Sequence, residues 1–148
     1  MIFFAIDPGP LGSDKHGWAT YNPYTQAVDA GEGCSNEVIG LMLRSGAPVM
    51  AIEKIVGQGR ARVGNETFDT VRAERDFERM AGFMGLDVKP ITRSKARGHV
   101  AGQHANDSKV RKALIARFPD TAHWRGTHRF AALAVAVTCA HNYKSQEV

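Results

Sequence analysis

Two short apolar runs in the first third of the chain each end at a carboxylate. Residues 2–6 end at Asp7, and residues 49–52 end at Glu53. Runs of this length that stop at a polar residue are typical of strands buried on both faces. Residues 36–44 lie between them, carry a broad apolar face and predict a helix that crosses over the sheet. Strands joined in this way are usually parallel, so Asp7 and Glu53 are expected to meet at the same end of the sheet.

The remaining apolar segments predict three more strands. Residues 17–21 and 27–31 flank the turn sequence 22–25, which predicts an antiparallel pair. Residues 86–91 predict a last strand. Pro90 favours an edge position for it, because proline donates no hydrogen bond to a neighbouring strand.

Apolar stripes and capping residues predict the other helices. Asn36 is expected to cap the crossover helix, and residues 106–108 to cap a helix that runs to Phe118. Residues 127–142 predict a final helix whose centre is apolar on every side and therefore buried. A long helix is predicted over residues 67–84, with a buried stripe formed by Ala73, Phe77, Met80, Ala81 and Met84.

These elements indicate an α/β fold with a five-stranded mixed sheet, three antiparallel strands followed by parallel ones, flanked by helices. The 148 residues fit one domain, 1–148, because a single core is normally sustained over about 100–200 residues. The short apolar start lacks the features of an export signal, so we expect a cytoplasmic protein with no membrane partner. Cys34 and Cys139 are too far apart in sequence to indicate a zinc site or a disulfide framework.

The middle of the chain carries the excess of positive charge. Residues 54–117 contain fourteen Lys or Arg and seven Asp or Glu, within a chain of net charge +4. Within this stretch, residues 57–64 are a glycine-rich loop and residues 93–107 look irregular. Such clustering is typical of a surface that binds phosphates, and it is equally typical of a solvated helix face.

The two strand-end acids predict a metal site. A single acid after a strand is most often a solvated residue or a helix cap, but two matching strand ends favour a pair. Carboxylates held close together repel each other unless they are protonated or bridged by a cation. Hard oxygen ligands suit Mg²⁺, for which Mn²⁺ is expected to substitute.

Four segments, spread over nearly the whole chain, resemble one known family. They are Ala-Ile-Asp-Pro-Gly at 5–9 with Gly-Trp-Ala at 17–19, Ala-Ile-Glu-Lys-Ile at 51–55, Asn-Asp-Ser-Lys-Val-Arg at 106–111, and Phe-Ala-Ala-Leu-Ala-Val-Ala at 130–136. They resemble the RuvC-like Holliday-junction resolvases of the RNase H-like superfamily. The resemblance implies a homodimer that depends on Mg²⁺ and nicks four-way DNA junctions in pairs.

The same resemblance implies the ligands of the site and reveals one departure. Asp7 would bind both metal ions, Glu53 would bind one, and His128 would bind metal, orient the phosphate or assist the water. The family's next acid falls at Ala131, whose methyl group cannot bind Mg²⁺. An inactivating substitution, a natural non-cleaving relative, and replacement by another acid such as Asp120 are the three explanations. We favour the first, because an Asp at 131 would complete the family pattern.

Basic residues around the predicted site are candidates for contacts with DNA phosphates, although each could equally be a solvated charge. Phe68 could wedge into an open junction, but the core of the long helix is the preferred place for it. The candidate DNA-binding residues are Arg60, Arg62, Phe68, Arg93, Lys95, Arg97, Lys109, Arg111 and Lys112.

Other functions remain open. A non-cleaving protein that binds junction DNA is one alternative, and an RNase H-like nuclease acting on RNA:DNA hybrid is another. An ATPase related to actin would need a second lobe and a glycine-rich phosphate motif, so no nucleotide cofactor is expected.

Overall fold

The protein folds around one five-stranded sheet covered by helices on both faces. A computed structural model describes residues 1–55 and 65–146. The strand order is β3-β2-β1-β4-β5. The strands are β1 (Phe3–Asp7), β2 (His16–Asn22), β3 (Ala27–Gly33), β4 (Val49–Lys54) and β5 (Asp87–Thr92). This mixed sheet is the one that the sequence predicts, and β5 lies at an edge as Pro90 indicates.

Strand pairing brings the two acids together. β1 pairs with β2 in antiparallel orientation and with β4 in parallel orientation, with Ile6 opposite Ile52. Asp7 and Glu53 are the next residues on their strands, so both reach the same end of the sheet. The prediction of two parallel strands ending side by side is therefore confirmed.

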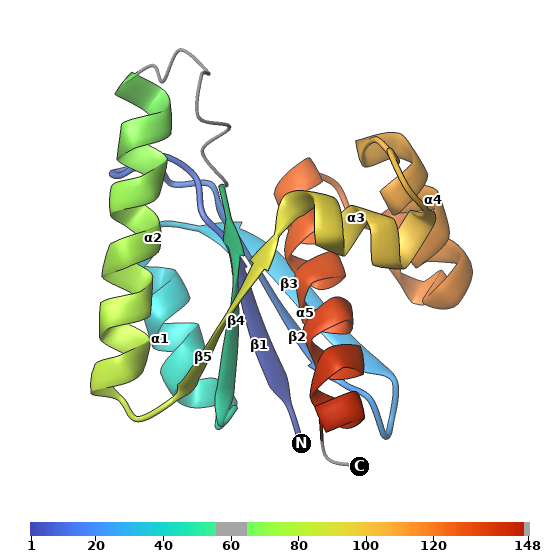
Figure 1. The fold of residues 1–148 in the computed structure, drawn as a ribbon, viewed down its shortest axis with the longest axis horizontal. Helices are drawn as coiled ribbons and strands as arrows, with labels where there is room; N and C mark the ends of the chain where they lie inside the picture. The colour runs from blue at the N-terminus through green and yellow to red at the C-terminus, as the bar shows by residue number, and fades with distance from the viewer. Residues whose placement is uncertain (56–64, 147–148) are drawn as a thin grey trace.

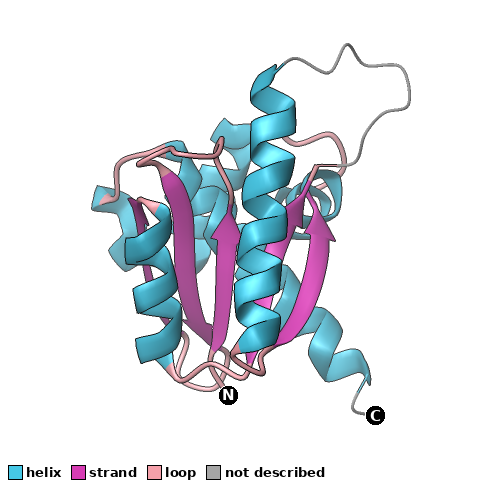
Figure 2. Ribbon diagram, turned by 90° about the vertical axis from the view of Figure 1, so that its left-hand side faces the viewer, coloured by secondary structure: helices cyan, strands magenta, loops and turns pink. Residues whose placement is uncertain are grey.

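One face of the sheet is covered by two helices that pack through large side chains. These helices are α1 (Ser35–Ser45) and α2 (Asn65–Phe83), which lie together on one side of the sheet in Figure 1. Phe4, Ile6, Met42, Met50 and Phe77 form the centre of this layer. Figure 2 shows α2 lying along the front of the sheet.

The other face is covered by α5 (Thr127–Gln146), which packs against β1 and β2. Its central residues are small, and residues 132–137 are at most 2% exposed. Small side chains let the helix axis approach the sheet closely, so the first turn of α5 lies beside the strand ends. The prediction that the centre of this helix is buried on every side is confirmed for residues 132–137.

Two further helices and one short turn lie beyond α5 on this face. They are α3 (Arg93–Ala101), α4 (Asp107–Arg117) and the 3₁₀ turn η1 (Pro119–His123), which the sequence did not predict. In the part of the chain that the structure describes, no helix is both long and apolar enough to span a bilayer.

The structure corrects the prediction that residues 93–107 are irregular. Residues 93–101 form α3 although they lack a long apolar stripe, because Thr92 accepts a hydrogen bond from the Lys95 N–H at 3.2 Å and caps the helix. Ala96 is 3% exposed, and Val100, one turn later, packs against the same core. The cap and these two tertiary contacts therefore stabilise a helix that lacks the amphipathic pattern by which helices are predicted from sequence.

Three smaller predictions were also wrong. The N-cap of α1 is Cys34, which makes no side-chain capping bond, and Asn36 lies inside the helix. Met80 is 38% exposed and Phe68 is 55% exposed, so neither belongs to the core of α2. The buried stripe instead includes Thr70 and Glu74, two polar residues that a hydrophobic pattern cannot reveal.

Candidate active site

Asp7 and Glu53 form a buried carboxylate pair at the strand ends. Each residue is 4% exposed, and their carboxyl groups share a hydrogen bond. Burial, the hydrogen bond to Asp7 and the Asp7 charge together raise the pKa of Glu53 to about 8. Burial alone would raise the pKa of Asp7, but hydrogen bonds from Glu53 and His128 outweigh it and lower that pKa. At neutral pH the pair therefore holds one proton, on Glu53, and one negative charge, on Asp7.

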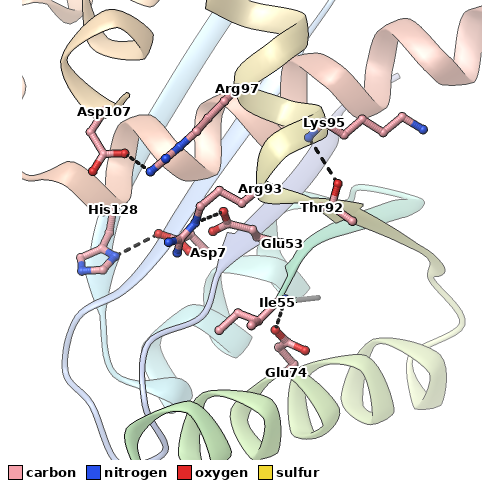
Figure 3. A network of polar contacts seen from close by, with 10 residues as sticks. All are labelled: Asp7, Glu53, Ile55, Glu74, Thr92, Arg93, Lys95, Arg97, Asp107 and His128. Atoms are coloured by element: carbon pink, nitrogen blue, oxygen red, sulfur yellow. Dashed lines mark hydrogen bonds and ion pairs between the residues drawn. The ribbon is translucent and has the colours of Figure 1, made fainter. Parts of the chain in front are cut away.

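His128 in the first turn of α5 contacts Asp7 directly. Its Nδ1 lies 2.9 Å from Oδ2 of Asp7, as Figure 3 shows. The hydrogen bond to Asp7 raises the pKa of His128, against the opposing effect of burial, and the Asp7 charge adds to the rise. The imidazolium form of His128 is thus favoured beside ionised Asp7.

Gly17 makes this contact possible. It pairs with Asp7 across β1 and β2, and a Cβ atom at this position would lie 2.3 Å from the carbonyl oxygen of His128. That separation is far below van der Waals contact, so any larger residue would push the start of α5 away from the sheet. In the sequence, Gly17 is only one residue of the Gly-Trp-Ala segment at 17–19. The structure shows why a glycine is needed there: a side chain would collide with the backbone of His128.

Arg93, the first residue of α3, contacts the other acid. Its Nε donates to Oε1 of Glu53 at 2.8 Å, while its side chain remains 55% exposed. The Glu53 charge is the main reason that the pKa of Arg93 is raised. Protonated Glu53 can accept from Arg93 with one oxygen and donate to Asp7 with the other.

Two buried polar residues that sequence reasoning missed hold the segments after the strands. His16, 0% exposed, accepts a hydrogen bond from the Gly9 N–H at 2.9 Å and fixes the turn after Asp7. Glu74, 2% exposed, accepts from the Ile55 N–H at 2.9 Å and fixes the chain after Glu53. Burial lowers the pKa of His16 and raises that of Glu74. A single polar residue at a strand start or in a helix gives no sequence signal for such a role.

A cavity of about 550 Å³ opens over the carboxylate pair. Asp7 and Glu53 lie at its base, and His128 and half-buried Ala131 line it from α5. Three arginines and one further acid also line it: Arg93, Arg97, Arg111 and Asp107. The cavity therefore combines two buried carboxylates with cations that suit a phosphate group.

Asp107 is the additional acid of this cavity, and the sequence did not single it out as a ligand. It lies in the first turn of α4 and is ion-paired with Arg97 of α3 (Figure 3). Asp120, the acid considered as a replacement at position 131, lies exposed in η1 and does not line the cavity. The structure therefore contradicts the idea that Asp120 completes the site.

The candidate DNA-binding residues fall into three groups. Arg93, Arg97 and Arg111 line the cavity, and Lys95 lines a neighbouring groove of about 980 Å³ together with Arg93 and Arg97. Arg111 also donates to the Trp124 carbonyl oxygen at 3.0 Å and lies over the Phe130 ring. Lys109 and Lys112 on α4 and Phe68 on α2 are exposed and do not line the cavity. Arg60 and Arg62 lie outside the described residues.

The donor set tests whether a metal fits. Among residues 1–55 and 65–146, no three His, Cys, Asp or Glu side chains are arranged to hold an ion. Two carboxylates are nevertheless sufficient for Mg²⁺, which commonly binds one or two carboxylates and completes its shell with water and substrate phosphate. Asp7 and Glu53 lie within hydrogen-bond distance, and two carboxylates this close would both ionise more readily if they held a cation. The pair fits a metal ion, whereas His128 is engaged with Asp7.

Comparisons with known proteins give structural matches only. No family model matches the chain, and no curated protein matches it in sequence. A structure of Thermus thermophilus RuvC in complex with a Holliday junction substrate matches with a TM-score of 0.72 and 17% identity, covering 99% of this chain and 96% of that one. A second structure, Thermus thermophilus RuvC, matches with a TM-score of 0.67 and 17% identity, covering 99% of this chain and 97% of that one.

These matches agree with the observed strand order and with the helical layers on both faces. At 17% identity they establish the architecture, while the residues of the site are known from this chain alone. The protein has a RuvC-like fold.

Proposed function

We propose that this protein is an endonuclease that cuts four-way or otherwise branched DNA by metal-dependent phosphodiester hydrolysis. The observation that carries the proposal is the buried, hydrogen-bonded pair of Asp7 and Glu53, which lines a cavity together with three arginines. Burying two neighbouring carboxyl groups costs free energy, and pKa shifts of this kind concentrate at functional sites. The RuvC-like fold supports branched DNA as the substrate.

Asp7 and Glu53 are the residues that would hold Mg²⁺, with Mn²⁺ as a substitute. The bound ion supplies the positive charge that activates a water molecule and stabilises the departing oxygen. In the reaction, a water oxygen forms a bond to phosphorus, the bond from phosphorus to the 3′ oxygen breaks, and that oxygen leaves with a proton. Glu53 must release its own proton for the ion to bind, so metal binding and proton release are coupled.

His128 and the arginines position the phosphate in this proposal. Nδ1 of His128 is engaged with Asp7, so Nε2 is the ring nitrogen available to donate to a phosphate oxygen. Arg93 and Arg97 lie on one face of α3, four residues apart, and present guanidinium groups to the same cavity. Guanidinium groups bind phosphate through paired hydrogen bonds, which fixes its orientation as well as its charge.

A synthetic four-way junction tests the proposal. The chain and its Ala131→Asp variant are each incubated with junction and Mg²⁺, beside Asp7→Asn as a control that should cut at least about 10²-fold more slowly. Symmetric paired cuts by the chain or by Ala131→Asp are expected. Junction binding with no cutting by either would favour the non-cleaving alternative, and preference for RNA:DNA hybrid would favour an RNase H activity.

Paired cutting also requires two sites, so we propose that the protein acts as a homodimer. A two-fold symmetric dimer would match the two-fold symmetry of a four-way junction. Sedimentation of the chain with and without junction DNA measures this directly. A single chain per junction at saturation would contradict it.

A further inference from the structure

The carboxylate pair already has a permanent cation beside it. Arg93 donates to Glu53 at 2.8 Å and also acts electrostatically on Asp7 and on Asp107. Figure 3 shows its guanidinium group lying across the pair. Because a guanidinium keeps its charge at every pH that a protein tolerates, this positive charge is a fixed part of the site.

The same cavity offers no additional free carboxylate for a second metal ion. Ala131 lines it with a methyl group, at the position where the resemblance leads us to expect an Asp. Asp107 is the one other acid among the described residues that line the cavity, and its carboxylate is ion-paired with Arg97. Asp7 and Glu53 are therefore the acids that the described cavity leaves for metal.

Charge balance then limits the number of divalent ions. Two carboxylates and one phosphodiester carry three negative charges, which the Arg93 guanidinium and one divalent ion already balance. Arg111 and His128, whose pKa is raised, add further positive charge to the same cavity. A second divalent ion would therefore leave at least two uncompensated positive charges over residues that are 4% exposed. Uncompensated charge in such a poorly solvated place is strongly unfavourable.

We propose that Arg93 takes the place of one of the two cations of a two-metal nuclease, so that this site binds a single divalent ion. The inference rests on the proposed nuclease function and replaces the expectation that Ala131 inactivates the chain. Arg93 would supply its charge to the phosphate through the guanidinium nitrogens that do not contact Glu53. Compared with a site that has an Asp at 131 and two divalent ions, this site has one negative charge fewer, one guanidinium more and one divalent ion fewer. Its net charge is therefore the same.

Counting bound Mn²⁺ on the full-length chain tests the exchange. One ion per chain is expected by calorimetry and by electron paramagnetic resonance. The double variant Arg93→Gln, Ala131→Asp removes the cation and adds the acid, and should bind two ions. The matched control Lys95→Gln, Ala131→Asp makes the same charge change on the same helix but keeps Arg93, and should still bind one.

Cleavage in Mn²⁺ gives a second readout. With enzyme in excess over junction, Arg93→Gln should cut about 10²-fold more slowly, the loss typical of removing one donor to a developing charge. Arg93→Lys should restore part of the rate, and the Arg93→Gln, Ala131→Asp double variant should regain activity. Junction affinity and melting temperature of each variant separate weaker binding or unfolding from slower cutting.

Several results would overturn the inference. Two ions or none on the unchanged chain, or a second ion on the Lys95→Gln, Ala131→Asp control, would show that Arg93 does not set the count. The ion count decides this point whether or not DNA is cut. If the counts are as expected and no variant cuts any branched DNA, the proposed nuclease function fails while the single-ion site stands.

Discussion

The two faces of the sheet are built from different side chains and tolerate change differently. The face under α1 and α2 packs through Phe4, Ile6, Met42 and Phe77, and it leaves Leu43 and Phe83 exposed at its rim. The face under α5 packs through alanines and valines, and at its upper end the helix backbone touches Gly17. Large side chains can readjust to fill space, whereas a backbone contact cannot. The face that carries the candidate site is therefore the less tolerant one.

The largest expected effect is on the stability of the α1 and α2 face. Met42 is 1% exposed in the core, so Met42→Ala should lower the free energy of unfolding by about 2–5 kcal/mol, through lost burial and a cavity. Urea denaturation measures the loss. The His128 pKa, followed by NMR, should stay raised, because Met42 is remote from the site. A fall in that pKa would show that the two faces are coupled.

The second effect is the pH dependence of the metal-free protein. The pKa of Glu53 is raised from 4.5 to about 8 and that of His128 is raised from 6.5, so the folded state binds more protons than the unfolded state. These contributions are fully present below the unfolded pKa values and are lost as pH rises through the folded ones. Between pH 5 and 8, the Glu53 proton alone should make stability fall by up to about 1.4 kcal/mol per pH unit.

Two variants locate that pH dependence. Glu53→Gln should remove most of it, whereas Glu74→Gln on the α2 side should remove less, because the hydrogen bond from the Ile55 N–H and the Lys54 charge oppose the effect of burial on the pKa of Glu74. Mg²⁺ should reverse the slope, since the ion binds the deprotonated pair. Thermal melts from pH 5 to 9 give the measurement, and a flat profile for the unchanged chain would contradict a shared proton.

The third effect is the change in stability when one glycine on each face is replaced by alanine. Gly17→Ala should cost about 1–3 kcal/mol and return the pKa of His128 towards 6.5, because α5 must move away from Asp7. Gly82→Ala in α2 meets no atom within 4 Å and should stabilise the helix by about 0.5–1 kcal/mol. Equal effects of the two substitutions would contradict the difference in tolerance between the faces.

The smallest expected effect is at the rim of α2. Phe83 is 90% exposed, so Phe83→Ser should change the free energy of unfolding by no more than about 0.5 kcal/mol. Denaturation at several protein concentrations tests this. A loss above about 2 kcal/mol that grows with concentration would show that Phe83 is buried in solution by a second copy.

The mixed five-stranded sheet and the meeting of Asp7 with Glu53 could be predicted from the sequence. Both follow from local patterns: apolar runs that end at an acid, a crossover helix between them, and a turn between two short strands. The buried centre of α5 could be predicted for the same reason, whereas the gap at Ala131 is implied only by the family resemblance. The roles of Asp7, Glu53 and His128 in metal binding and cleavage stay predictions.

Tertiary structure alone decided what surrounds the pair. Thr92 caps α3 and Ala96 packs into the core, and both contacts stabilise the helix. The first residue of this helix, Arg93, is thereby placed within hydrogen-bond distance of Glu53. His16 and Glu74 support the strand ends from residues 7 and 19 positions away along the chain. Such contacts depend on where the packed fold places one side chain. A single polar residue forms no periodic pattern in the sequence, so the contact cannot be predicted from it. The sequence by itself determined where two carboxylates meet; packing determined that they share a hydrogen bond and that Arg93 contacts Glu53.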